Sequence, residues 1–134
     1  MTIDLNKYVD FVNATTSQPS KNFPDFSARL ADLQREGFPT ERLLTAAVGM
    51  SAEAGEFTEI VKKIVFQGKP VNEENVFHLK RELGDIMWYV AQACMGLDIS
   101  LEEVIQMNFE KLSARYPEGA FTIERSENRK EGDL

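Results

Sequence analysis

The sequence predicts an all-α protein, a helical bundle of about five helices that is completed by dimerisation. Through most of the chain, apolar residues recur at the three- and four-residue spacing of amphipathic helices. Few segments alternate between apolar and polar residues with a period of two, so a sheet is not expected. Gly and Pro residues separate the apolar segments from one another, as they do at the ends of helices.

Length and composition define the broad class of protein. The chain has 134 residues, of which 43% are hydrophobic, and this is the size of one domain with its own core. The net charge of −7 argues against binding to nucleic acid or to acidic membranes. No apolar run approaches the roughly 20 residues of a membrane span, and the first residues show no secretory signal. The single Cys94 cannot form an internal disulfide, so a cytoplasmic location is expected.

The first expected helix carries an amphipathic pattern at Leu5, Tyr8, Val9 and Val12. Thr2 or Asp4 can cap it, and it should end near residues 15–17. The following residues, 17–24, have the composition of a loop. A second, shorter helix is expected from about residue 25 to residue 36, with Gly37 as its stop.

Two long helices are expected in the middle of the chain. The first runs from about residue 41 to residue 66 and ends before Gly68 and Pro70. The second begins after Asn72, a good N-cap residue, and runs to about residue 95, with Gly96 as its stop. Since the connection between them is short, the two helices should be antiparallel neighbours.

The last expected helix has the clearest start. Residues 100–103 fit a capping box, and Ile99 and Val104 are placed for a hydrophobic staple. The helix should end near Tyr116, because Pro117 cannot easily continue it. Residues 122–134 are mostly charged or small. The sequence thus predicts a single domain over residues 1–121 and a charged, mobile tail over residues 122–134.

Each of the two long helices carries a pair of acidic residues three positions apart: Glu53 with Glu56, and Glu82 with Asp85. Residues at this spacing project from one face of a helix. Two such helices side by side would gather carboxylates that repel one another unless a cation lies among them. Carboxylate oxygens suit a hard divalent ion, so the pattern predicts a site for Mg²⁺, with Mn²⁺ as a substitute.

An acidic pair on a helix is by itself common on solvated surfaces. Two features favour a site. Each pair has a glycine just before its second acid, Gly55 and Gly84, where a helix or ligand could approach closely. Both pairs also lie next to apolar stripes, where a buried carboxylate needs a compensating charge.

The spacing of the pairs resembles the E-x-x-E…E-x-x-D signature of the MazG-like, all-α nucleoside triphosphate pyrophosphohydrolases. The pairs are separated by residues 57–81, and the similarity continues along about residues 40–121. The flanking segments that resemble the family are 82–89, 96–104, 108–112 and 115–119. The resemblance implies hydrolysis between the α- and β-phosphates of a nucleoside triphosphate, which gives a monophosphate and pyrophosphate. It also implies that Glu53, Glu56, Glu82 and Asp85 are the catalytic and metal-binding residues, with Glu53 or Glu56 as the proton acceptor.

The residues expected to bind the substrate are Lys63, Trp88, Asn108, Lys111, Arg115 and Tyr116. Lys111 and Arg115 match positions where the family places cations against the triphosphate, and Trp88 with Tyr89 could stack on a base. Without the family, the two cations would be interpreted as a solvated basic stripe, and the aromatic residues as core or a subunit contact. Lys63 could equally serve the helix dipole, and Asn108 could be a surface residue.

Other functions fit parts of the pattern. A dUTP or phosphoribosyl-ATP specialist on the same scaffold is a close alternative, and a non-catalytic helical dimerisation or regulatory module is a more distant one. The complete acid set with Lys111 and Arg115 argues against the module. A di-iron bundle would need Glu-x-x-His pairs, and the chain has one histidine.

The long helices carry more apolar residues than one narrow stripe needs, among them Phe57, Ile60, Met87, Trp88 and Met107. An exposed patch of this kind is rare in soluble monomers, and pairing about a two-fold axis would bury it. Members of the MazG-like family are similarly dimers or dimers of dimers, in which the partner chain can help to close the nucleotide pocket. A homo-oligomer is therefore expected.

Overall fold

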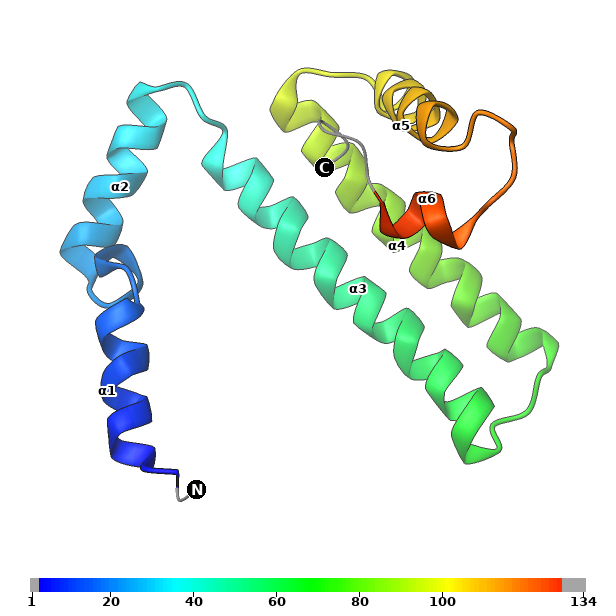
Figure 1. Ribbon diagram of the computed structural model, residues 1–134, viewed down its shortest axis with the longest axis horizontal. Coiled ribbons are helices and arrows are strands. Elements are labelled where there is room, and N and C mark those ends of the chain that lie inside the picture. Colours follow the sequence, from blue (N-terminus) through cyan, green and yellow to red (C-terminus); the bar gives the residue numbers. More distant parts are fainter. Residues whose placement is uncertain (1–2, 129–134) are drawn as a thin grey trace. The chain divides into compact units, whose positions relative to one another are not determined.

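The computed structural model describes residues 3–128, and within this range it contains helices and no strand. The helices are α1 (Leu5–Thr15), the short 3₁₀ helix η1 (Gln18–Ser20), α2 (Phe23–Arg35), α3 (Thr40–Gln67), α4 (Glu73–Leu97), α5 (Leu101–Arg115) and α6 (Ile123–Glu127), as Figure 1 shows. The predicted all-α class is confirmed. The chain forms two compact units, one up to residue 40 and the other from residue 41 onward. The expected single domain over residues 1–121 stays a prediction.

The first unit contains α1, η1 and α2. The Asp4 carboxylate accepts hydrogen bonds from the N–H groups of Asn6 and Lys7, both at 3.1 Å, and caps α1 as predicted. Asn22 accepts a hydrogen bond from the N–H of Asp25 at 3.0 Å, so α2 begins two residues earlier than predicted. Gly37 follows α2 with a φ of 77°, the left-handed conformation that a helix stop requires.

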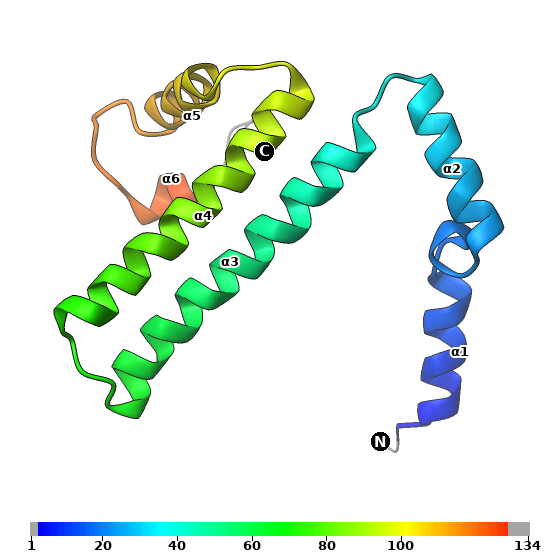
Figure 2. The ribbon, with the colours of Figure 1, turned by 180° about the vertical axis from the view of Figure 1, so that it is seen from behind.

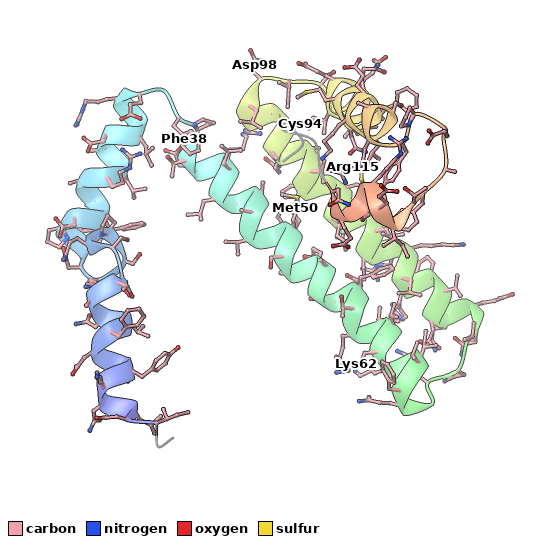
Figure 3. The ribbon with its side chains drawn as sticks, viewed as in Figure 1. Phe38, Met50, Lys62, Cys94, Asp98 and Arg115 are labelled. Carbon is pink, nitrogen blue, oxygen red and sulfur yellow. The ribbon has the colours of Figure 1, made fainter. Side chains whose placement is uncertain are left out.

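In the second unit, α3 and α4 run antiparallel and side by side, as both views of the ribbon show (Figures 1 and 2). Their bounds lie close to the predicted ones, and the Asn72 side chain accepts a hydrogen bond from the N–H of Asn75 at 2.9 Å, as a cap should. The predicted stop at Gly96 is wrong. The helix passes through Gly96 to Leu97, and Asp98 takes the left-handed conformation with a φ of 54° (Figure 3).

Gly96 has a different use within α4. A Cβ atom on it would lie 3.3 Å from Cδ2 of Leu43 on α3, which is tighter than ordinary contact. This glycine therefore lets the two long helices approach each other near the end of α4. Because it lies near a helix end, the sequence indicated a helix stop instead.

The last two helices, α5 and α6, are each capped by a hydroxyl side chain. The Ser100 hydroxyl accepts a hydrogen bond from the N–H of Glu103 at 3.0 Å, which confirms the predicted cap of α5. In the segment expected to be a tail, Thr122 caps the one-and-a-half-turn helix α6 by accepting from the N–H of Arg125 at 3.3 Å. Arg125 also donates to Glu118 at 2.8 Å. These local bonds stabilise a helix that the charged composition of the segment did not predict. Residues 129–134 of the expected tail lie outside the described residues.

Few apolar side chains are buried. Among the described residues, the buried apolar side chains are Ala46 on α3 and Cys94 on α4. The thiol of the buried Cys94 is free. Other apolar side chains of α4 remain accessible; Leu83, for example, is 50% exposed. None of the described helices is long and apolar enough to cross a membrane.

Candidate metal centre

Three predicted acids converge between the two long helices. Glu53 comes from the middle of α3, and Glu82 and Asp85 come from α4. One carboxylate oxygen from each residue lies within 4.8 Å of the others. The antiparallel pairing brings the middle of one helix beside the middle of the other, and the three-residue spacing puts both α4 acids on one face. The cluster therefore follows directly from the sequence spacing and the hairpin.

The electrostatics of this cluster favour a cation. Partial burial of Glu53 raises the pKa of its carboxyl group above the ordinary value, and the nearby charges of Glu56, Asp85 and Glu82 raise it further. A hydrogen bond between the side chains of Glu53 and Glu82 acts in the same direction. The donor set is made entirely of carboxylate oxygens, as a hard divalent ion prefers, so these three residues fit the predicted metal.

Glu56, the fourth predicted acid, lies apart from this oxygen cluster. Its side chain is exposed, and it is absent from the group whose oxygens approach one another. Its charge nevertheless contributes to the pKa of Glu53. It therefore stands beside the cluster, one helical turn from Glu53.

The close approach expected at Gly55 and Gly84 is not found within the described chain, because a Cβ atom on either would meet no neighbouring atom within 4 Å. The close approach occurs at Gly49 instead, where a Cβ atom would overlap the ring of Tyr89. Pattern reading missed Gly49, because its role depends on a partner from another helix.

An aromatic wall borders the acids. Glu53, Asp85, Trp88 and Tyr89 line a hollow of about 310 Å³. The rings of Trp88 and Tyr89 meet edge to face, with centroids 4.9 Å apart and an interplanar angle of 88°. The Trp88 side chain is 55% exposed, so its ring is open to a ligand in this chain. Trp88 and the acids Glu53 and Asp85 thus line the same hollow.

The predicted cations and α5 residues lie at other places. Lys63, near the end of α3, forms an ion pair with Glu59 at 3.1 Å, and its neighbour Lys62 (Figure 3) also pairs with Glu59. Asn108 and Tyr116 line a separate hollow of about 420 Å³ between α5 and the segment before α6. This hollow shares no lining residue with the hollow beside the acids.

The two remaining predicted cations are both on α5. Lys111 is exposed, and Arg115 is half-buried in the last turn of the helix (Figure 3). Within one chain, the structure does not gather the α5 residues around the hollow that Glu53 and Asp85 line.

The fold and the site define a class: all-α proteins in which an antiparallel helix pair carries a cluster of acidic side chains. Comparison with known proteins identifies the family. The model of the MazG nucleotide pyrophosphohydrolase domain matches residues 41–120, which is more than half of the chain, and the chain therefore belongs to this family. The resemblance predicted from the acid pairs is confirmed, over nearly the same residues.

One curated protein is similar to part of the chain. The Gene 37 protein of Mycobacterium phage L5 is 44% identical over 80 residues, which cover 59% of this chain and 70% of the phage protein. No solved structure matches the chain. The matched family model is that of a nucleotide pyrophosphohydrolase domain. Residues up to 40 lie outside the matched region.

Proposed function

We propose that this protein is a Mg²⁺-dependent nucleoside triphosphate pyrophosphohydrolase that cleaves between the α- and β-phosphates and releases a nucleoside monophosphate and pyrophosphate. Clearing of unwanted nucleotides is a role consistent with this reaction. The observation that carries the proposal is the approach of Glu53, Glu82 and Asp85 to within 4.8 Å, in a chain of the MazG family. The free thiol of Cys94 suits the reducing cytoplasm, where we place the protein.

In this proposal, the three clustered carboxylates hold the ion, and Mn²⁺ can replace Mg²⁺. The bound ion would neutralise the polyphosphate and lower the pKa of a water molecule. Glu56 belongs to the same acid set, but its exposed carboxylate lies outside the cluster. We therefore assign Glu56 to accept the proton of the attacking water, since it is the acid least used as a ligand.

The substrate-binding residues are proposed to act in a homo-oligomer, a dimer or a dimer of dimers. Lys63, Lys111 and Arg115 would neutralise phosphate oxygens, while Asn108 and Tyr116 would contact the nucleoside. The hollow that contains Asn108 and Tyr116 is separate from the acids within one chain. A second copy would bring such residues to the acids.

Phosphorus NMR of the reaction with mixed nucleoside triphosphates tests the reaction. We expect pyrophosphate and monophosphate with Mg²⁺, and no turnover with a chelator. Glu82→Gln and Asp85→Asn should each reduce turnover by at least roughly 100-fold, because each removes a ligand charge. Glu73→Gln makes the same charge change in the first turn of α4, away from the cluster, and should leave turnover unchanged. Orthophosphate as the first product, or a fully active Glu82→Gln variant, would contradict the proposal.

A further inference from the structure

A second hollow adjoins the one beside the acids. It has a volume of about 250 Å³ and is lined by Glu41, Arg42, Thr45, Trp88 and Gln92. The first three come from the start of α3, and the last two from the C-terminal half of α4. Trp88 lines both this hollow and the hollow of Glu53 and Asp85. The two hollows therefore adjoin each other at the Trp88 side chain.

The polar groups of this second hollow have a defined arrangement. Arg42 on α3 donates from Nη1 to Oε1 of Gln92 on α4 at 3.1 Å, and the same nitrogen lies 3.3 Å from Sδ of Met95. This bond occupies the amide oxygen of Gln92, and no hydrogen bond of its amide nitrogen is found among the described residues. The hollow thus combines the Glu41 carboxylate, which accepts hydrogen bonds, with donors, the amide N–H groups of Gln92 and further N–H groups of Arg42, beside the aromatic ring of Trp88.

The spacing along α4 gives these groups an order. Asp85, Trp88 and Gln92 are three and four residues apart, so they rise along the helix by about 4.5 Å and then by a further 6 Å or so. A nucleotide has the same sequence of parts, with charged phosphates at one end, a flat ring system beyond the sugar, and a polar edge on that ring. Phosphates at the acids would place the ring at Trp88 and its edge at Gln92.

We propose that the hollow formed by Glu41, Arg42, Thr45, Trp88 and Gln92 is the base-recognition subsite of this protein. This inference rests on the proposed function and specifies which nucleotides it acts on. The base stacks on Trp88, and the donors of Gln92 and Arg42 bind a carbonyl oxygen on its edge. Bases with a carbonyl group, such as uracil and guanine, are therefore preferred to adenine, which has none.

Tryptophan fluorescence tests the stacking, because Trp88 is the sole tryptophan of the chain. The full-length protein is titrated with uridine monophosphate and, separately, with inorganic pyrophosphate, both with Mg²⁺. We expect uridine monophosphate to quench the emission and pyrophosphate to leave it nearly unchanged. A blue-shifted emission that neither compound alters would show that a second copy covers Trp88, and this result would overturn the subsite.

A substrate panel tests recognition of the edge. In the unchanged protein, kcat/KM should be higher for UTP and GTP than for ATP. In Gln92→Ala, the preference for UTP over ATP should fall roughly 3- to 10-fold, as expected for the loss of one hydrogen bond. Gln106→Ala is the matched control, because Gln106 on α5 also uses its amide in a bond on a helix surface, to Glu110 at 2.7 Å. Its preference should not change.

The outcomes separate the two proposals. If the unchanged protein releases pyrophosphate but prefers ATP, the subsite is wrong and the proposed function stands. The same holds if Gln92→Ala lowers kcat/KM equally for all substrates. If no nucleoside triphosphate yields pyrophosphate while uridine monophosphate still quenches Trp88, the proposed function fails and a nucleotide-binding hollow remains.

Discussion

Two glutamates on the same helix have opposite electrostatic environments. Glu53 faces other carboxylates, and its pKa is raised from the ordinary value of 4.5, with partial burial as the largest cause. Glu59 is six positions further along α3 and accepts hydrogen bonds from Lys62 and Lys63, which lower its pKa. Comparing the two residues therefore measures how much the acid cluster lowers the stability of the metal-free protein.

We predict that the two glutamates contribute to stability with opposite pH dependence when metal is removed. The raised pKa of Glu53 means that its contribution is fully present below its unfolded pKa and is lost as pH rises through the folded value. The lowered pKa of Glu59 means that its contribution is present above its unfolded pKa and is lost as pH falls through the folded value.

Thermal unfolding of Glu53→Gln and Glu59→Gln, with a chelator, measures the two contributions between about pH 4 and pH 7. Relative to the unchanged protein, the Tm of Glu53→Gln should rise as pH increases, because the substitution removes a carboxylate that the cluster repels. The Tm of Glu59→Gln should fall over the same range, because the substitution removes the partner of two lysines. Equal trends for both variants would show that the acids do not repel one another in solution.

The residues of the site differ in how far the sequence reveals them. The spacing of the acids and the antiparallel hairpin together predict the approach of Glu53, Glu82 and Asp85, because helix periodicity is local and regular. Periodicity alone did not show that Glu56 would lie outside the oxygen cluster, since its distance from α4 depends on how α3 is rotated about its axis. Lys63 was expected to contact phosphate, and its pairing with Glu59 was equally accessible from the four-residue spacing.

At the scale of helices, Gly49 is where α3 and the Tyr89 side chain of α4 approach most closely. A Cβ atom there would overlap the Tyr89 ring, whereas a Cβ atom on Gly55 of the same helix would meet open space. The ring of Tyr89 also lines the hollow beside the acids. The packing of the two helices and the shape of the site therefore depend on the same contact.

We predict that alanine has opposite effects at these two glycines. Gly49→Ala should lower the free energy of unfolding by about 1–3 kcal/mol, because the aromatic ring must move from a packed position. Gly55→Ala should raise it by up to about 1 kcal/mol, because alanine favours the helix and nothing obstructs its methyl group. Urea unfolding at one fixed protein concentration measures both. A stabilised Gly49→Ala variant would contradict the described contact between Gly49 and Tyr89.

Helix boundaries were predictable where a single side chain determines them. Asp4, Asn72 and Ser100 cap their helices through bonds to residues two or three positions away, so the evidence for them is contained in a few residues. Gly96 misled the prediction, because a glycine near a helix end can serve either a stop or a close contact, and only the position of Leu43 distinguishes them. The short helix α6 depends on Thr122 and on the pairing of Arg125 with Glu118, which composition does not reveal.

At the scale of the whole molecule, the amount of exposed surface is the notable feature. Within the second unit, large apolar side chains remain accessible on all three longer helices, among them Val65, Met87 and Met107. A standard protein interface covers roughly 800 Å² of each partner, and accessible apolar side chains on three helices of one unit are suited to such a contact.

We predict that the protein is a homo-oligomer, at least a dimer, and that its folded state depends on association. Met87 and Met107, expected from the sequence to lie outside a lone chain, are indeed exposed, at 46% and 61%. With Ala46 and Cys94 as the buried apolar side chains among residues 3–128, one copy has little core of its own. Burial of apolar surface is the main favourable term in folding, so a second copy must supply much of it.

Static light scattering at micromolar concentration should therefore give at least twice the 15.2 kDa mass of one chain. The Tm should rise with protein concentration, because association stabilises only the folded form. An active monomer whose Tm does not change on dilution would show that the accessible apolar side chains need no partner.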